Sequence, residues 1–383
     1  MTVAAGKLYA SAGAVARLLP KGVRPYVRVA AFRLPSRALR RLVLVRHLHR
    51  NARTSAGMGS ELYGSLLERV ADDVAAGGPC WDVLGNYRPS GPVLDDGLGF
   101  RFMAGVHRLV LAGDAPDLAP YYPSAGGTER GDPWPAFRDT VAANLDRLRQ
   151  LLERGLQTNE VGRCRALVGG FLTVARETGL PLRLLEVGAS AGLNLRWDRY
   201  RYEIGGATWG DPGSPVRIVD GFEHGQPDLS GDATVAERRG CDLAPVDATS
   251  EDDRLWLKAS LWPDQVERFR LLEGALRIAE TVPVQIERAE AADWLERRLA
   301  EPAEGRTTVV YHSIVMRYLT EAGRARVRSV IEAAGASATS SAPLAWLQLE
   351  GVGVQDISLR LWPGGEERLL GKTDPQARRV RWL

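Results

Sequence analysis

The chain of 383 residues is long enough for two domains of ordinary size, and its composition, 45% hydrophobic and 25% charged, is typical of a globular protein. No apolar run reaches the roughly 18 residues of a membrane span, and no signal peptide is evident, so we expect a cytoplasmic protein without a membrane span. Three widely spaced cysteines and five histidines in no ligand pattern argue against a disulfide framework and against a metal site.

The net charge of +3 conceals an asymmetry along the chain. The first 60 residues hold twelve Lys and Arg and no acidic residue, whereas the rest holds 38 basic and 47 acidic residues. Because the body of the protein is acidic, we do not expect it to bind nucleic acid. We expect residues 1–42 to be a disordered basic extension or to reflect a start codon placed too far upstream. The alternative is a basic arm that contacts an anionic partner.

Apolar residues recur at helical spacing over the next part of the chain. We expect helices over residues 61–76, 100–112, 135–154 and 160–177. Since no strand pattern interrupts the first three, we assign residues 43–156 to an N-terminal helical cap domain.

Two polar segments in this part of the chain are candidate substrate contacts. The loop Tyr121–Thr128 is rich in turn residues and aromatics, and it is either a binding surface or a packed connector. The cluster Gln157–Arg163 either caps a helix or leans over a ligand, because that helix leads directly into the strand that carries Glu186. The candidate substrate residues are Tyr122, Asn159, Glu160 and Arg163.

The rest of the chain is organised around a strand and the turn that follows it. Leu182–Val187 is a short apolar run typical of a buried strand, and small residues follow it before a helix expected over 193–199. Small residues let a ligand approach the backbone, and the first N–H groups of a helix carry partial positive charge. The candidate ligand-binding residues here are Glu186, Gly188, Ser190, Gly192 and Asn194. An ordinary strand-to-helix turn is the alternative.

Two chemistries use such a turn. The pattern from Glu186 to Gly192 resembles the acidic, glycine-rich loop of class I S-adenosylmethionine methyltransferases, with Ser190 in place of the middle glycine. Gly-x-Ser-x-Gly is also the nucleophile elbow of α/β-hydrolases, but those proteins place several strands and an oxyanion segment before the elbow. Here helices precede it and no His-Gly-Gly occurs, which favours the methyltransferase. The dinucleotide fingerprint fails because position 190 is Ser and position 195 is Leu.

The next segment, over residues 203–235, is an insertion into the sheet domain. Short strands are expected at 201–204 and 216–219, on either side of a turn that contains Trp209 and Asp211. These two side chains are candidates to face a substrate, and a simple turn is the alternative.

Two later segments resemble further methyltransferase motifs. Asp242 ends a strand and resembles the acid that holds the ribose hydroxyls of the cofactor, although it lies about fifty residues after Gly192 rather than the usual twenty, and its strand is charged. A strand over 282–287 and the acidic turn after it resemble the segment beside the adenine. This resemblance implies that Glu290 or Asp293 bonds the adenine amino group, and helix capping by Asp293 is the alternative.

Histidine 312 is the candidate catalytic residue. It ends a buried strand at 307–311, and ligands of open α/β sheets bind at the carboxyl ends of strands. There it would act as a general base or hold a substrate oxygen; a buried histidine bonded to backbone is the alternative. A strand over 344–349 and a hairpin of 357–362 with 367–370 end the chain.

Several segments together resemble the DUF2332 family of bacterial proteins, found largely in actinobacteria. The matching segments are Tyr121–Thr128, Gln157–Arg163, Glu186–Asp198, Glu237–Asp247, Trp262–Gln265 and Val310–Ser313. The resemblance covers about residues 43–383 and its motifs are specific to that family, which has no assigned function and is distantly similar to class I methyltransferases.

We therefore expect an α/β protein in which an N-terminal helical domain precedes a Rossmann-like class I methyltransferase sheet over 157–383 with a C-terminal β-hairpin. The expected reaction is methyl transfer from S-adenosylmethionine to a small-molecule substrate. The alternatives are an esterase that uses Ser190 with His312, a non-catalytic Rossmann-fold protein, and a protein that binds a partner through its basic arm.

Overall fold

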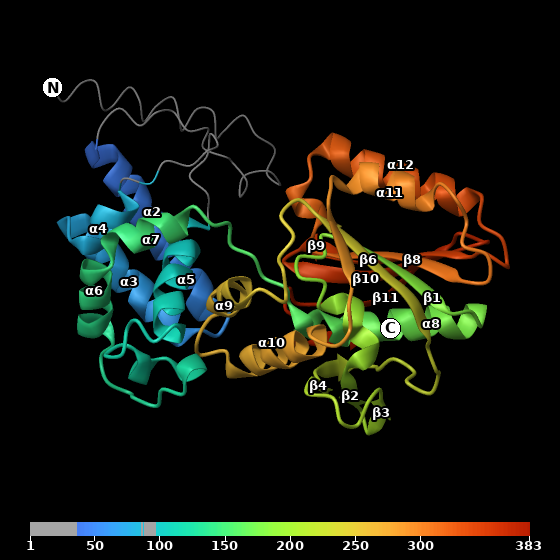
Figure 1. The fold of residues 1–383 in the computed structure, drawn as a ribbon, viewed down its shortest axis with the longest axis horizontal. Helices are drawn as coiled ribbons and strands as arrows, with labels where there is room; N and C mark the ends of the chain where they lie inside the picture. The colour runs from blue at the N-terminus through green and yellow to red at the C-terminus, as the bar shows by residue number, and fades with distance from the viewer. Residues whose placement is uncertain (1–36, 86, 88–96) are drawn as a thin grey trace. The chain divides into compact units, whose positions relative to one another are not determined.

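The computed structural model describes residues 37–85, 87 and 97–383, so the expectation for residues 1–36 lies outside the described residues. The chain forms two compact units (Figure 1). One holds the described residues up to Val106 together with Asp132–Gly155, and the other holds His107–Gly131 and Leu156–Leu383. The segment His107–Gly131 thus groups with the sheet, whereas the sequence pattern placed it in the helical domain.

The first unit is helical, as predicted for this part of the chain. Its helices are α2 (Arg37–Gly57), α3 (Glu61–Ala76), α4 (Pro79–Leu84), α6 (Trp134–Ala143), α7 (Leu145–Leu152) and the first turns of α5 (Leu98–Leu111). Ser60 caps α3 by accepting from the N–H of Tyr63, and Gly77 ends it in a left-handed conformation. The single helix expected over 135–154 is wrong, because Asn144 leaves the helical region and its side chain bonds the carbonyl of Thr140.

The second unit contains a nine-stranded sheet in the order β5-β12-β11-β10-β9-β8-β1-β6-β7. Its strands are β1 (Leu182–Val187), β5 (Phe222–His224), β6 (Val235–Asp242), β7 (Gln285–Arg288), β8 (Thr307–Ser313), β9 (Leu344–Val352), β10 (Val354–Trp362), β11 (Glu367–Thr373) and β12 (Val380–Trp382). The five strands from β7 to β9 are parallel, and β10 to β12 add an antiparallel meander. The predicted mixed α/β class and the hairpin of β10 with β11 are confirmed.

Helices cover both faces of this sheet (Figure 1). Alternation along β1 sends Leu182 and Leu184 into the core with α8 (Cys164–Thr178) and α10 (Val266–Ala279). Leu185 and Val187 enter the core on the other face, which α11 (Ala291–Leu299) and α12 (Glu321–Ala336) cover. None of the helices in the described part of the chain has both the length and the apolar character that a membrane crossing requires.

The insertion forms its own small sheet and contributes to the large one. The small sheet has the order β3-β2-β4, from β2 (Arg201–Ile204), β3 (Ala207–Trp209) and β4 (Arg217–Val219), while β5 pairs with β12 at the edge of the main sheet. Before the insertion lies η5 (Asn194–Arg199), a 3₁₀ segment. The helix expected over 193–199 is thus present as a 3₁₀ segment, and it is interrupted at Arg196, whose dihedrals of −105° and 18° are non-helical.

The order of the parallel strands locates the switch point of the sheet. From β1 the chain continues to β6 and β7 on one side and to β8 and β9 on the other, so the order reverses between β1 and β8. Open α/β sheets bind ligands outside the carboxyl ends of the strands at such a switch point. Gly188, Asp242 and Ile314 begin or flank the loops at this edge.

Candidate functional site

The turn after β1 is tightly packed against its neighbours. Its backbone takes positive φ angles at Gly188 (71°), Ser190 (53°) and Gly192 (65°). A Cβ at Gly188 would collide with the side chain of Val315, and one at Gly192 would lie 2.8 Å from Ile286. Both glycines are thus required by backbone conformation and by packing, and their expected approach to a cofactor stays a prediction.

The carboxylate of Asp242 is joined to this turn. Its Oδ2 accepts from the backbone N–H of Ser190 at 2.9 Å, and its Oδ1 accepts from that of Ala244 at 2.9 Å. Asp242 is half-buried, and each carboxylate oxygen keeps a lone pair after these bonds. The structure therefore leaves acceptor capacity for two further donors, such as vicinal hydroxyls.

The segment Gln157–Arg163, called here the bracing segment, holds the loops at the carboxyl edge. The Oε1 of Gln157 accepts from the hydroxyl of Ser190 at 2.6 Å, and the Oδ1 of Asn159 accepts from the N–H of Leu193 at 3.0 Å. At the other end, Arg163 donates to the carbonyl of Ser313 at 2.9 Å. The sequence left open a capping or a ligand-facing role, and the observed contacts are with the turn after β1 and with the end of β8.

Two further candidates belong to the same buried network. The Asn194 side chain donates to the carbonyl of Glu160 at 3.4 Å and accepts from the thiol of Cys164 at 3.4 Å. The carboxylate of Glu160 pairs with Arg268 of α10, with one bond of 2.9 Å from Nε, and both side chains are mostly buried. These contacts hold Asn194 and Glu160 in place, so a ligand would have to displace them to bond either side chain.

Glu186 lies beneath the turn rather than at the surface. Its side chain is 2% exposed and accepts from the hydroxyl of Tyr311 at 3.1 Å, across the β1–β8 pair. Burial raises the pKa of this carboxyl to about 8, while the bond from Tyr311 opposes the shift. Burial thus favours the protonated form of Glu186, in which the carboxyl donates a hydrogen bond as well as accepting one.

His312 is fully buried at the end of β8, and both ring nitrogens have partners. Nε2 accepts from the indole N–H of Trp346 at 2.9 Å, which makes Nδ1 the protonated nitrogen, and Nδ1 donates to Glu350 at 2.8 Å. Burial opposes ionisation of Glu350, but the bonds from His312 and from backbone N–H groups lower its pKa below the usual range. A proton-accepting role for His312 requires the bond from Trp346 to break, and that role stays a prediction.

Two predicted residues do not join this cluster. Asp293 lies exposed on α11 and pairs with Arg326 of α12 at 2.5 Å, and the side chain that caps α11 is Glu290. Tyr122 is buried beside His107, with ring centroids 5.5 Å apart, and its hydroxyl has no partner within the described residues. Their predicted roles toward adenine and substrate therefore have no support from contacts with the turn after β1.

Sequence reasoning missed Glu350 and Trp346, which fix the His312 ring, and Tyr311, which bonds Glu186. Trp346 and Glu350 follow each other at even spacing along β9, so strand alternation places both on the face that His312 occupies. The alternation can be read from the sequence, but it points to His312 only when β9 is known to pair with β8.

A comparison with known protein families assigns the chain to one of them. The family described as uncharacterized proteins conserved in bacteria, DUF2332, matches residues 45–382. The chain belongs to the DUF2332 family. Neither the curated proteins nor the solved structures contain a match to it. The DUF2332 assignment confirms the resemblance over nearly the whole described chain, and it brings no activity with it.

Proposed function

We propose that this DUF2332 protein binds S-adenosylmethionine at the carboxyl edge of its sheet and transfers the methyl group to a small molecule. The observation that carries the proposal is the hydrogen bond from the backbone of Ser190, in the turn after β1, to the carboxylate of Asp242. This bond lies at the switch point of the sheet. If the strands of the insertion are left out, the five parallel strands follow one another along the chain as β1, β6, β7, β8 and β9. Their spatial order, β7-β6-β1-β8-β9, is then the order 3-2-1-4-5 of doubly wound nucleotide-binding sheets.

The side chains present fit the polar parts of such a cofactor. Asp242 has lone pairs for both hydroxyls of a ribose, since its present bonds use one from each oxygen. Burial favours the protonated form of Glu186, which would offer a hydrogen-bond donor under the turn. Because η5 is a short 3₁₀ segment, the proposal does not rely on the charge of a helix N-terminus.

The bound sulfonium would supply an electrophilic methyl group, and the work of the chain would be alignment. The bracing segment would hold the turn in register while the nucleophile approaches. Glu350 and Trp346 would position the His312 ring at the end of β8.

The test is isothermal titration of the full chain with S-adenosylhomocysteine. We expect micromolar binding, and we expect Asp242→Asn to weaken it by about tenfold or more, since hydrogen bonds to a charged group are the strong ones. The matched control is Asp247→Asn, because Asp247 also bonds backbone and side chain of a nearby turn residue, Thr249. Failure of the wild type to bind would remove the proposal, and so would equal binding by both variants with unchanged melting curves.

One observation favours the hydrolase alternative. Ser190 takes a positive φ of 53°, and a strained serine between strand and helix is what a nucleophile elbow contains. Against it, the Ser190 hydroxyl is bonded to an amide oxygen of Gln157, which cannot accept the proton as a base. A fluorophosphonate probe decides the matter: covalent labelling that is lost in Ser190→Ala supports a hydrolase, and an unlabelled chain excludes it.

A further inference from the structure

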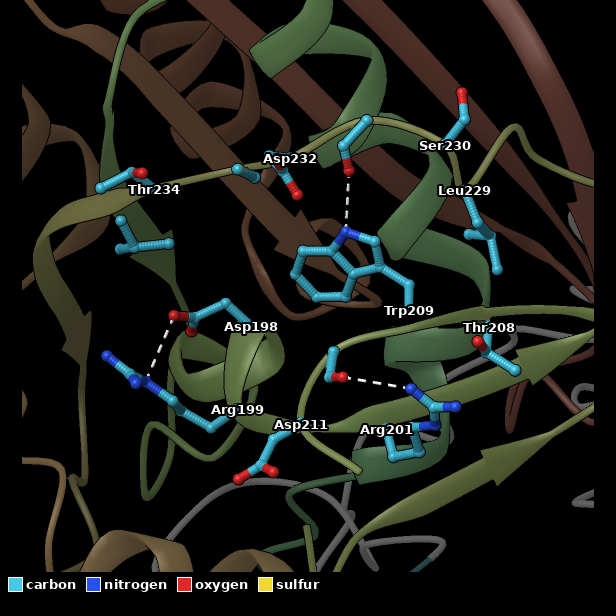
Figure 2. A pocket seen from close by; sticks show the side chains of 14 residues that line it. Asp198, Arg199, Arg201, Thr208, Trp209, Asp211, Leu229, Ser230, Asp232 and Thr234 are labelled. Carbon is cyan, nitrogen blue, oxygen red and sulfur yellow. Dashed lines mark hydrogen bonds and ion pairs between the residues drawn. The ribbon is translucent and has the colours of Figure 1, made fainter. Parts of the chain in front are cut away.

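A groove of about 760 Å³ lies in the sheet unit (Figure 2). Side chains of η5, β2, β3 and residues 229–235 line it. The carbonyl of Thr234 accepts from the N–H of Leu182, and Val235 starts β6, so this segment lies at the amino ends of β1 and β6. The groove is therefore at the opposite edge from Gly188 and Asp242, and its volume is within the usual range for small-molecule sites.

Trp209 is held rigidly among the side chains that line the groove (Figure 2). One face of its ring stacks on Trp197 with centroids 5.1 Å apart, and Trp197 stacks in turn on Phe171 at 4.5 Å. Its indole N–H donates to the carbonyl of Gly231 at 2.8 Å. Because Trp197 and Phe171 are fully buried, this column fixes the orientation of the half-buried Trp209 ring before any ligand arrives.

Three of the charged side chains that line the groove already have partners of opposite charge. Asp198 accepts two bonds of 2.6 Å from Arg238 and lies 3.4 Å from Arg199. Arg201 donates to the carbonyl of Gly210 at 3.2 Å and lies 3.7 Å from Glu203. The arginines that could bind a phosphate or carboxylate ligand are thus already paired, and the carboxylates of the lining would repel such a ligand.

The remaining lining is polar and rich in groups that bond hydroxyls. Asp211 keeps acceptor capacity beyond its bond of 2.8 Å from the N–H of Gly213. Further polar lining residues are Thr208, Ser230, Asp232 and Thr234. Apolar molecules would leave these groups without partners, which costs free energy.

We propose that this groove binds a neutral carbohydrate. A sugar ring has an apolar C–H face that would pack on Trp209, and vicinal hydroxyls that would donate to the Asp211 carboxylate. The lining combines one rigid aromatic platform with hydroxyl groups, with the paired charges of Asp198, Arg199 and Arg201, and with the carboxylates of Asp211 and Asp232. This binding site is independent of the methyl-transfer proposal, because it lies at the other edge of the sheet.

The test is saturation-transfer NMR and calorimetry of the full chain with maltotetraose, cellotetraose and chitotetraose as probes. We expect at least one of them to bind with a dissociation constant of about 1 mM. Trp209→Ala should weaken that binding by about tenfold or more, and Asp211→Asn, which keeps an oxygen for the N–H of Gly213, should weaken it severalfold. The matched control is Trp134→Phe, an aromatic substitution in the helical unit, which should bind as the wild type does.

Three results would overturn the inference. One is the absence of binding by all three sugars at about 10 mM. Another is binding that neither Trp209→Ala nor Asp211→Asn changes. The third is tighter binding of glucose 1-phosphate than of the neutral sugars, which would mark an anion site. Since Trp209→Ala could disturb the ring column, Asp211→Asn serves as the variant that leaves the column intact.

Discussion

The hydroxyl of Ser190 donates a hydrogen bond of 2.6 Å to Oε1 of Gln157, and so joins the turn after β1 to the bracing segment. Ser190 is also held at a φ of 53°, where a side chain adds about 1–2 kcal/mol of strain. The carboxylate of Asp242 holds the backbone N–H of the same residue. Two polar contacts therefore stabilise a conformation that serine disfavours, at the carboxyl edge of the sheet.

Two substitutions separate the hydrogen bond from the strain. Ser190→Ala removes the bond to Gln157 and keeps the strain, so we expect it to lower the free energy of unfolding by about 1 kcal/mol. Ser190→Gly removes the same bond but relieves the strain, so we expect it to be about 1 kcal/mol more stable than the alanine variant. Urea denaturation measures both. An alanine variant that equals the glycine variant would show that the positive φ carries no strain.

The stability of the sheet unit should fall with rising pH because of Glu186. Burial raises the pKa of this carboxyl to about 8 from an ordinary 4.5, so the folded state retains a proton that the unfolded state has lost. The contribution is fully present below pH 4.5 and is lost as the pH rises through 8. Between these values Glu186→Gln should remove a slope of up to about 1.4 kcal/mol per pH unit. Melting curves from pH 5 to 9 would measure this slope.

The control for Glu186 is the exposed Glu304→Gln, which should leave the pH dependence as it is in the wild type. If the melting temperatures of the wild type and of Glu186→Gln run parallel over that range, the carboxyl is ionised in the folded protein. Its proposed role as a hydrogen-bond donor under the turn would then fail.

His107 should make the stability of the protein rise with pH, between about pH 4 and pH 6.5. It is fully buried, its Nδ1–H is shared by the carbonyls of Ala259 and Leu261 at 3.1 Å, and its Nε2 accepts from Ser124 at 2.7 Å. Burial lowers its pKa to about 4, although the two carbonyl bonds oppose the shift. Its stabilising contribution is present above pH 6.5 and is lost as the pH falls toward 4.

The measurement for His107 is the unfolding free energy of the wild type and of His107→Gln between pH 4 and 7. We expect the variant to be less stable at pH 7, because Ser124 and the two carbonyls lose their partner, but to lose less stability on acidification. His224→Gln, at an exposed histidine, is the control. Equal acid slopes in the wild type and in His107→Gln would mean that His107 is charged when folded.

Local patterns predicted the elements, while long-range contacts escaped them. The apolar run at 182–187, the helix at 61–76 and the C-terminal hairpin were found because periodicity and turn residues are local signals. The bond between Gln157 and Ser190 and the pairing of β5 with β12 depend on the order of strands in the sheet. Asn144 shows that periodicity can also miss a helix break. The apolar pattern continues through this residue, but its side-chain bond to the carbonyl of Thr140 accompanies the end of the helix.

The packing of Gly188 is the last prediction. Its φ of 71° strains any side chain, and a Cβ there would also collide with Val315. Gly179, at the end of α8, has a similar φ of 64° but nothing within 4 Å of its Cβ position, so Gly179→Ala reports the strain alone. We expect Gly179→Ala to lower the free energy of unfolding by about 1 kcal/mol, and Gly188→Ala to lower it by a further 1–3 kcal/mol or so from overpacking. The double variant Gly188→Ala with Val315→Ala should recover part of the difference. Urea denaturation of the wild type, Gly188→Ala, Val315→Ala and the double variant forms a double-mutant cycle. If the cycle shows no coupling, then Val315 does not restrict the turn, and glycine at position 188 is explained by its backbone conformation alone.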